Sequence, residues 1–322
     1  MRTNSPTSLI AAGLMLAIGA CSAAGTPSQV DGGLERSELR VGTLPIADVA
    51  PVHIAISEGL FAAEGLTVTT EITQGGAAAI PALVAGDLDI AYGAWPSFLL
   101  ANSEGIELRA VADGVAAAPG FTEFLALSGS GLEGNPAGMA GKTIAVNTLN
   151  SIGELAVRTT LTEAGVDPND VQLVEIPFPD MAATLERGDV DVIWASEPVA
   201  TVAKTSVGAI VVADSFVGDM EGFPVAGYQA TADFAAENPR TIAAFQRAMA
   251  AASARARSDS ALVQTLLPEF TSLTPELAAD IALPDYGGAL NASVLRRVQD
   301  TLIEFELLDR ELDIESLVLP SG

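Results

Sequence analysis

The chain has 322 residues, of which 49% are hydrophobic and 17% charged, a composition typical of a globular protein with one large domain or two smaller ones. Its 41 acidic and 15 basic residues give a formal net charge of −26 at neutral pH. This balance excludes a basic surface for nucleic acid or for an anionic membrane, so we expect no nucleic-acid partner.

The first twenty residues have the layout of a secretory signal peptide. A positive start at Arg2 precedes a short apolar run from Leu9 to Ile18, and two small residues come before Cys21. The apolar run is shorter than the roughly 20 residues that a membrane-spanning helix needs. The sequence therefore predicts export from the cytoplasm, with residues 1–20 removed.

Cys21 is the only cysteine of the chain, and Ile18-Gly19-Ala20-Cys21 resembles a bacterial lipobox. In a lipobox the thiol is acylated and the cysteine becomes the new N-terminus, although leucine is the commoner residue where Ile18 stands. An ordinary signal peptide with a chance cysteine is the alternative. A single cysteine allows no intrachain disulfide and no cysteine-based metal site. We expect residues 21–38, rich in small and polar residues, to form a flexible tether between a lipid anchor and the folded part.

From Leu39 onward, short β-branched runs alternate with apolar helical segments, the pattern of a parallel α/β sheet. The first series predicts strand 40–44, helix 52–63, strand 67–73, helix 80–85, strand 88–92, helix 96–104 and strand 108–112. The same order returns as strand 143–146, helix 151–164, strand 171–176, helix 180–187, strand 190–194, helix 198–206 and strand 209–212.

Both series contain the same junction between a helix and a strand. Gly86-Asp87-Leu88-Asp89 in the first series matches Gly188-Asp189-Val190-Asp191 in the second. In each, the glycine can adopt the left-handed conformation that ends a helix. Two such junctions at matching places favour two similar lobes over the alternative, one continuous doubly wound sheet.

The remaining residues are expected to return to the first lobe. They predict strand 223–231, a long helix 239–257, and helical segments 262–269, 275–282, 292–308 and 314–319. Two chain crossings, near 121–128 and 214–224, would then form a hinge on which the lobes close. Lobe one is predicted to comprise residues 39–121 and 222–322, and lobe two residues 122–221.

Several motifs, in their order and spacing, resemble those of the substrate-binding proteins of the nitrate, sulfonate and taurine ABC importer group. They include Val41-Gly-Thr-Leu-Pro-Ile-Ala, Gln74-Gly75-Gly76, Met139-Ala-Gly-Lys-Thr-Ile-Ala-Val and Ala232-Asp-Phe-Ala-Ala-Glu-Asn-Pro. The same sequence family includes proteins that bind the pyrimidine precursor of thiamine. The resemblance covers roughly Leu39 to Arg257.

The resemblance implies the α/β, two-lobed type II periplasmic-binding-protein fold, in which each lobe is a mainly parallel sheet with helices on both faces. It also implies a small ligand clamped between the lobes and delivered to an ABC permease and ATPase. We expect a monomer on the outer face of the cytoplasmic membrane, held there only by its lipid anchor.

Ligands of α/β sheets bind at the carboxyl ends of the strands, so the candidate site residues are those that follow each predicted strand. In lobe one they are Asp48, His53, Gln74, Gly75, Gly76, Trp95 and Ser97. In lobe two they are Asn147, Asn150, Ser151, Phe178, Trp194 and Glu197.

Some of these candidates precede helices, so each could cap its helix instead of binding a ligand. Gly75 and Gly76 would let backbone N–H groups reach partial negative charge on a ligand, or simply form a tight turn. Ser151 and Glu154 have the spacing of a capping box, which would leave Asn147 free to face the ligand. Glu197 could cap the next helix or accept a hydrogen bond from a ligand N–H.

The two tryptophans, Trp95 and Trp194, each follow the third predicted strand of their lobe. They would suit a flat ligand held between them, and packing against a neighbouring helix is the alternative. His53, the only histidine, is expected to pack or hydrogen-bond within the first helix, and it makes no metal site alone.

None of the candidate loops contains lysine or arginine. The site therefore favours a neutral or weakly basic heterocycle over nitrate or a sulfonate, unless Arg158 or Lys204 reaches in from a helix. The loops show no nucleophile with a base, no metal cluster and no phosphate loop, so we expect no cofactor, no metal and no catalysis.

Two other functions remain open. The pyrimidine synthase of thiamine biosynthesis is similar in sequence and fold, but that group carries a cysteine-rich active-site motif and works inside the cell. The other alternative is a lipoprotein that senses a ligand without transporting it.

Overall fold

The computed structural model describes residues 33–288 and 290–322, without the side chain of Asp219. The predicted signal peptide, the predicted lipidation site Cys21 and most of the predicted tether lie outside the described residues.

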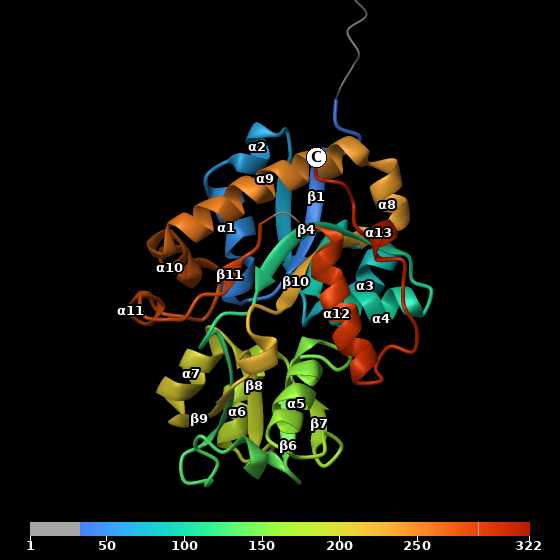
Figure 1. Ribbon diagram of the computed structural model, residues 1–322. Helices are drawn as coiled ribbons and strands as arrows, with labels where there is room; N and C mark the ends of the chain where they lie inside the picture. The colour runs from blue at the N-terminus through green and yellow to red at the C-terminus, as the bar shows by residue number, and fades with distance from the viewer. Residues whose placement is uncertain (1–32, 289) are drawn as a thin grey trace, which may run out of the picture. The chain divides into compact units, whose positions relative to one another are not determined.

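The first sheet has six strands in the order β11-β4-β10-β3-β1-β2 (Figure 1). They are β1 (Glu38–Thr43), β2 (Thr67–Ile72), β3 (Ile90–Ala94), β4 (Leu108–Ala116), β10 (Pro224–Thr231) and β11 (Asp285–Tyr286). β1 pairs in parallel with β2 and β3, whereas β10 lies antiparallel between β3 and β4. β4 therefore keeps the common direction but does not pair with β3.

The second sheet has five strands in the order β7-β6-β8-β5-β9. They are β5 (Thr122–Leu127), β6 (Thr143–Val146), β7 (Gln172–Glu175), β8 (Val192–Ser196) and β9 (Ala209–Asp214). β6 pairs in parallel with β7 and β8, and β5 lies antiparallel between β8 and β9. Both sheets thus follow one plan, in which a strand entering from the other lobe is inserted antiparallel beside the third strand.

Helices lie on either side of the first sheet (Figure 1). One group contains α1 (Ala50–Ser57), α2 (Leu60–Ala63), α9 (Pro239–Ser258), α10 (Ser260–Phe270) and α11 (Pro275–Ala278). The other contains α3 (Gly76–Ala85), α4 (Trp95–Ser103), α8 (Ala232–Glu237), α12 (Ala292–Glu304) and α13 (Ile314–Leu317). The second sheet is accompanied by α5 (Ile152–Glu163), α6 (Phe178–Glu186) and α7 (Val199–Ser206). Short 3-10 helices are η1 (Ala47–Val49), η2 (Pro136–Met139) and η3 (Gly218–Met220).

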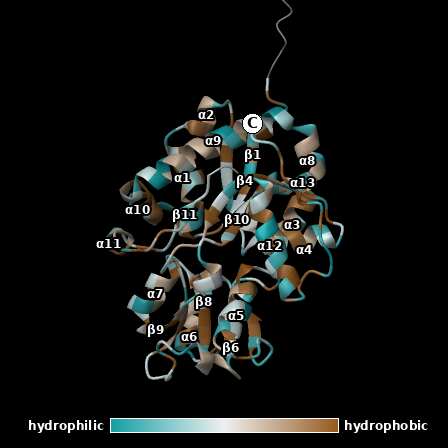
Figure 2. Cartoon of the chain, viewed as in Figure 1, coloured by the Kyte–Doolittle hydropathy of each residue, from teal (hydrophilic) through white to brown (hydrophobic). Residues whose placement is uncertain are grey.

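Hydrophobic patterning explains which elements are buried on all sides. Every residue of β8 is buried, and its ribbon is mostly brown in Figure 2. α12 instead carries apolar residues on one face only, with Leu295, Val298 and Leu302 buried. Central strands of such sheets are covered on both faces, whereas a peripheral helix needs one apolar stripe.

The repeated junction has the predicted conformation in both lobes. Gly86 and Gly188 have φ values of 75° and 71°, in the left-handed region that glycine adopts without strain. The second aspartate of each junction then contacts β1 or its equivalent β6. Asp89 accepts a hydrogen bond from the backbone N–H of Arg40 at 2.7 Å, and Asp191 accepts one from that of Thr143 at 2.9 Å. The shared sequence therefore encodes a shared connection.

The chain passes between the two sheets at residues 117–121 and 215–223. The second predicted crossing, near 214–224, agrees with this, but the first, near 121–128, is wrong. Residues Thr122–Leu127 form β5, which pairs with β8 on one side and β9 on the other and is buried at all but its last residue. An inserted central strand was not anticipated at this place because its run of six residues has no flanking helix to mark it.

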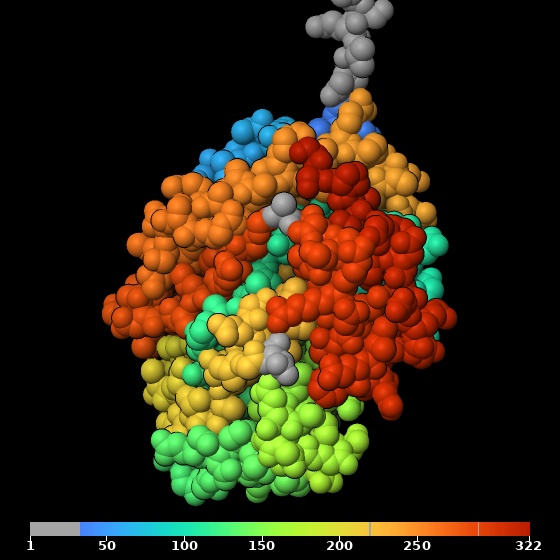
Figure 3. Space-filling model, in the orientation of Figure 1, coloured from blue at the N-terminus to red at the C-terminus, as the bar shows by residue number. Residues whose placement is uncertain are grey.

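Residues near the C-terminus hold the second crossing in place. The C-terminal part of the chain forms a continuous area of the surface in Figure 3. Arg297 of α12 donates hydrogen bonds to the carbonyl oxygens of Glu221 and Gly222, at 3.0 and 2.9 Å. Its guanidinium also lies 5.2 Å from the centre of the Phe223 ring. α12 thus limits the positions that this crossing can take.

The end of the predicted tether is fixed to the folded part. The Glu35 carboxylate accepts hydrogen bonds from the backbone N–H groups of Arg240 and Thr241 at the start of α9. Burial raises the pKa of Glu35, but these backbone hydrogen bonds and that of the Arg240 side chain outweigh it and hold the pKa at about 2. The prediction of a flexible segment up to residue 38 is wrong for its last residues, because a helix N-terminus binds a carboxylate there.

Candidate functional site: a cavity between the two sheets

A cavity lies where the carboxyl ends of the strands of both sheets meet. It is lined by Leu44, Ile46, Asp48, Gly75, Gly76, Tyr92, Gly93, Ala94, Phe121, Thr122, Asn147, Ser151, Ile152, Phe178, Trp194, Ser196, Val225 and Ala226. The space open to the centre of a water molecule is only about 30 Å³, enough for one or two waters. The lobes are closed on this cavity, and a ligand of more than a few atoms can enter only after they separate.

Asp48 supplies the negative charge of the cavity. It belongs to η1, directly after β1, and is 3% exposed. Its carboxylate accepts hydrogen bonds from the hydroxyl of Tyr92 at 2.8 Å and from that of Ser196 at 3.4 Å. Burial nevertheless raises the pKa of Asp48 to about 6, because these hydrogen bonds offset only part of the desolvation.

Aromatic side chains of lobe one surround this carboxylate. The rings of Tyr92 and Tyr228 meet edge to face with centres 5.4 Å apart, and the hydroxyl of Tyr286 donates to the carbonyl oxygen of Ala47 at 2.9 Å. The Tyr228 hydroxyl is buried and has no hydrogen-bond partner. This part of the wall is therefore an apolar enclosure in which the Asp48 charge is poorly screened.

The wall from lobe two combines two aromatic rings. Phe178 at the start of α6 and Trp194 on β8 have ring centres 6.0 Å apart at an angle of 32°. The Trp194 indole N–H donates to the Ser215 hydroxyl at 3.2 Å, which fixes the ring. Both rings line the cavity, so an aromatic or apolar part of a ligand would contact them.

Some polar atoms of the cavity wall have no partner. The Asn147 amide N–H donates to the carbonyl oxygen of Gln74 at 3.3 Å, whereas its Oδ1 is buried and unpartnered. The hydroxyls of Thr122 and Thr148 are also buried without a partner. Buried polar atoms normally have hydrogen-bond partners, so unpartnered atoms around a cavity mark places for water or ligand.

Direct hydrogen bonds join the two lobes around the cavity. Besides Asn147 to Gln74, the Ser97 hydroxyl donates to the carbonyl oxygen of Asn150 at 3.0 Å, and the Ala47 N–H donates to that of Glu197 at 3.0 Å. Asn150 has a φ of 52°, in the left-handed region. These contacts contribute to the closed arrangement of the lobes.

The structure brings seven of the thirteen predicted site residues to the cavity wall: Asp48, Gly75, Gly76, Asn147, Ser151, Phe178 and Trp194. Of the other six, Gln74, Ser97, Asn150 and Glu197 take part in the contacts between lobes. His53 and Trp95 lie elsewhere.

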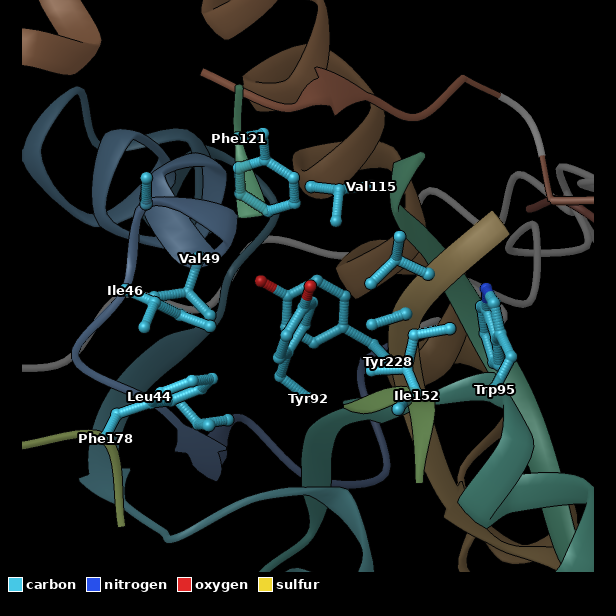
Figure 4. Close-up of a cluster of buried hydrophobic side chains, with 14 of the residues drawn as sticks. Leu44, Ile46, Val49, Tyr92, Trp95, Val115, Phe121, Ile152, Phe178 and Tyr228 are labelled. Carbon is cyan, nitrogen blue, oxygen red and sulfur yellow. The ribbon is translucent and has the colours of Figure 1, made fainter. Parts of the chain in front are cut away.

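The predicted pair of tryptophans around a ligand is not formed. Trp95 is completely buried within lobe one, packed so closely on β10 that a methyl group on Gly227 would lie 2.1 Å from its ring. In Figure 4, Trp95 lies on one side of the buried cluster and Phe178 on the other, with Tyr92 and Tyr228 between them. Packing, the alternative for this residue, applies to Trp95, whereas Trp194 lines the cavity.

His53 packs as expected, on the outer helices of lobe one. Its ring stacks on Phe270 of α10 with the centres 3.8 Å apart, and burial lowers the pKa of His53 to about 4. It is therefore neutral at physiological pH and is absent from the residues that line the cavity.

Of the two side chains that could have capped a helix, one does so and the other does not. Glu197 accepts hydrogen bonds from the N–H and the hydroxyl of Thr201, at 3.1 and 2.9 Å, so its carboxylate caps α7. Ser151 makes no side-chain cap, and the predicted capping box is not formed, because Glu154 instead accepts from the Asn150 N–H at 3.1 Å. The Ser151 side chain thus remains available to the cavity.

No basic side chain reaches the cavity among the residues that the structure describes. Arg158 pairs with Glu154 at 2.9 Å, and Lys204 pairs with Glu123 at 2.7 Å. The two basic side chains on neighbouring helices that were candidates to reach the cavity are therefore paired with glutamates elsewhere.

The predicted list omitted several residues of the wall. Tyr92 and Ser196 lie at the end of, or just after, the third predicted strand of their lobes, and the structure places them on β3 and β8, which end two residues later than predicted. Phe121, Thr122, Val225 and Ala226 lie where the chain enters or leaves the crossings. Their position beside a hinge was the signal that could have identified them, since both crossings must pass the space between the lobes.

The described residues, 33–288 and 290–322, contain no helix that combines the length and the apolar character needed to cross a bilayer. They also contain no group of three histidine, cysteine, aspartate or glutamate side chains placed to hold a metal ion.

The paired sheets, the two crossings and the cavity between them define the two-lobed type II periplasmic-binding-protein fold. Solved structures with this fold include the alkanesulfonate-binding protein of Xanthomonas axonopodis pv. citri bound to MOPS, with a TM-score of 0.75 and 19% identity, over 89% of this chain and 99% of that one. The periplasmic nitrate-binding protein of Synechocystis PCC 6803 gives a TM-score of 0.73 with 15% identity, over 88% and 85% of the two chains.

The family follows from the sequence. A model of the NMT1-like family matches residues 32–265, which is well over half of the chain. The chain therefore belongs to the NMT1-like family. The taurine-binding periplasmic protein of Escherichia coli (strain K12) is 24% identical over 198 residues, 61% of this chain and 60% of the relative's own length. The resemblance drawn from the motifs is thus confirmed at the level of family and fold.

Proposed function

We propose that this protein is an extracytoplasmic solute-binding lipoprotein of an ABC importer. It captures a small molecule between its two lobes, without transforming it, and delivers it to a permease and its ATPase. The named relatives bind taurine, alkanesulfonates or nitrate, and the family and fold that the chain shares with them support this function. The Cys21 thiol would carry the lipid that keeps the monomeric protein at the outer face of the cytoplasmic membrane.

The observation that carries the proposal is the shared wall of the cavity. Asp48 comes from lobe one, Asn147 and Trp194 from lobe two, and Phe121 from a crossing. Because both lobes contribute, a ligand would contact both only when they close. Closing on a ligand couples binding to a change of shape, which is what a membrane partner can recognise.

Thermal shift of the mature protein, residues 21–322, tests the binding function. The solutes are nitrate, ethanesulfonate, taurine and aminopyrimidines, each at increasing concentration. A solute at a hundredfold its dissociation constant should stabilise the protein by about 2.7 kcal/mol. If no small solute raises the midpoint of unfolding, the binding function is contradicted.

The two tryptophans provide a matched test of where the solute binds. Trp194 lines the cavity and Trp95 lies in the interior of lobe one. We expect Trp95→Phe to keep the change in tryptophan emission that a bound solute causes, and Trp194→Phe to lose it. The reverse result would place the site away from this cavity.

The lipid anchor has its own test in cells. Cys21→Ser removes the thiol that would be acylated, while Ser22→Ala is a control one residue away. We expect the Cys21 variant to lose radiolabelled fatty acid and membrane retention, and the control to keep both. A variant without Cys21 that remains bound and processed as the wild type would contradict the lipoprotein assignment.

A further inference from the structure

The charge of the cavity is not balanced by the protein. Asp48 is the only charged side chain among the described residues that line it. Its two side-chain partners, Tyr92 and Ser196, are neutral donors. A carboxylate offers about four acceptor positions, so these hydrogen bonds leave acceptor capacity unused. A buried carboxylate without a cation is costly, and a positively charged ligand would offset that cost.

The opposite lobe also presents an acceptor. The Asn147 amide is oriented by Gln74, whose carbonyl oxygen can only accept and therefore takes the amide N–H. This leaves the Asn147 Oδ1 as the unpartnered atom, on a residue that is 6% exposed and lines the cavity. Asp48 and Asn147 thus both require hydrogen-bond donors, from opposite sides of the same space.

The rest of the wall suits a cationic group attached to an apolar or flat body. Phe178 and Trp194 supply aromatic faces, and Leu44, Phe121 and Ile152 supply apolar surface. Aromatic faces attract cations and pack against flat rings. An anion, in contrast, would lie beside the Asp48 carboxylate with no lysine or arginine among the described lining residues to offset their repulsion.

We propose that the ligand carries a protonated amine or amidine, whose N–H groups pair with the Asp48 carboxylate of lobe one and the Asn147 Oδ1 of lobe two. This inference rests on the solute-binding function proposed above and names the chemical class that the cavity selects. A cation bridging these two groups also links the lobes, so it stabilises their closed arrangement.

The test uses matched probes and an isosteric variant. Benzamidine and benzoate have nearly the same shape with opposite charge, and taurine differs from ethanesulfonate by its ammonium group. Calorimetry at pH 7.5 on the mature protein should show the amine-bearing member of at least one pair binding at least tenfold more tightly than its partner. Asp48→Asn should remove this preference, and the surface control Asp191→Asn should keep it.

The pH dependence provides a second measurement. The titratable groups facing Asp48 are Tyr92 on β3, Tyr228 on β10 and Tyr286 on β11, and burial raises the pKa of each above its ordinary value. The tyrosines stay neutral between pH 5 and pH 8, so among these four groups only Asp48 titrates there. Since burial places the pKa of Asp48 at about 6, amine affinity should fall as the pH drops from 7.5 to 5 in the wild type only.

The possible outcomes separate the two proposals. If neither benzamidine nor taurine binds more tightly than its partner, or if the preference is unchanged in Asp48→Asn, the cationic ligand is overturned while the binding function stays in place. The same holds if none of the four probes binds but another solute does in the thermal-shift series. If no solute binds at all, both proposals fail.

Discussion

The two lobes contain the same helix–strand junction, but its aspartate is buried in one lobe and exposed in the other. Asp89 in lobe one is 3% exposed and pairs with Arg36 at 2.8 Å and with Arg40 at 3.5 Å. The equivalent Asp191 has a side chain 43% exposed and pairs with Lys142 at 3.5 Å. Closely similar local sequences therefore give the same backbone connection with different electrostatic surroundings.

The difference comes from a segment that only lobe one possesses. Residues before β1 lie against the start of α9, where the Arg36 N–H donates to the Thr241 hydroxyl at 3.0 Å. This segment places the Arg36 guanidinium over Asp89. In lobe two the strand equivalent to β1 is β6, and it is preceded by β5 and η2 instead of by such a segment. The segment that precedes the first strand of this series thus determines whether the aspartate of the junction is buried or exposed.

The largest effect is expected from removing the buried aspartate. Asp89→Ala leaves the Arg40 N–H and two guanidinium groups without their shared acceptor, and it should lower the free energy of unfolding by about 2–4 kcal/mol. Asp191→Ala, the matched change in lobe two, should cost less than about 1 kcal/mol because water replaces the carboxylate there. Urea unfolding of the mature protein measures both. Equal losses would show that burial does not distinguish the two junctions.

The walls of the cavity also differ between lobes. Lobe one brings backbone close to it beside the side chains of Asp48 and Tyr92. Gly76 and Gly93 are in such close contact that a methyl group on Gly76 would lie 2.7 Å from the Gly93 Cα. Lobe two approaches it with side chains, mainly those of Asn147, Phe178 and Trp194. Lobe one thus supplies the one charged side chain of the described wall, whereas lobe two supplies the Phe178 and Trp194 rings.

The sequence predicted the parts of this molecule that local chemistry determines. Hydrophobic runs and the glycine junctions predicted the order of strands and helices, and Asp48, Asn147 and Trp194 followed from their positions after strands. The positions of β5 and β10 inside the sheets could not be predicted, because both depend on pairing between residues far apart in the chain. That insertion of β10 explains Trp95: Gly227 of β10 gives its ring a place inside lobe one.

The smallest expected effect concerns a contact that joins the lobes. The Ser97 hydroxyl of lobe one reaches the Asn150 carbonyl of lobe two, whereas Ser103, on the same helix, donates to the Leu100 carbonyl of its own helix at 2.7 Å. Ser97→Ala removes a hydrogen bond that exists only when the lobes are closed, so it should weaken solute binding by about 1 kcal/mol, roughly fivefold. Ser103→Ala removes a similar bond within one lobe and should leave affinity unchanged. Calorimetry with the tightest solute from the thermal-shift series measures both. Equal affinity in the two variants would mean that the Ser97 hydrogen bond does not stabilise the closed lobes and that the other contacts between them hold this arrangement.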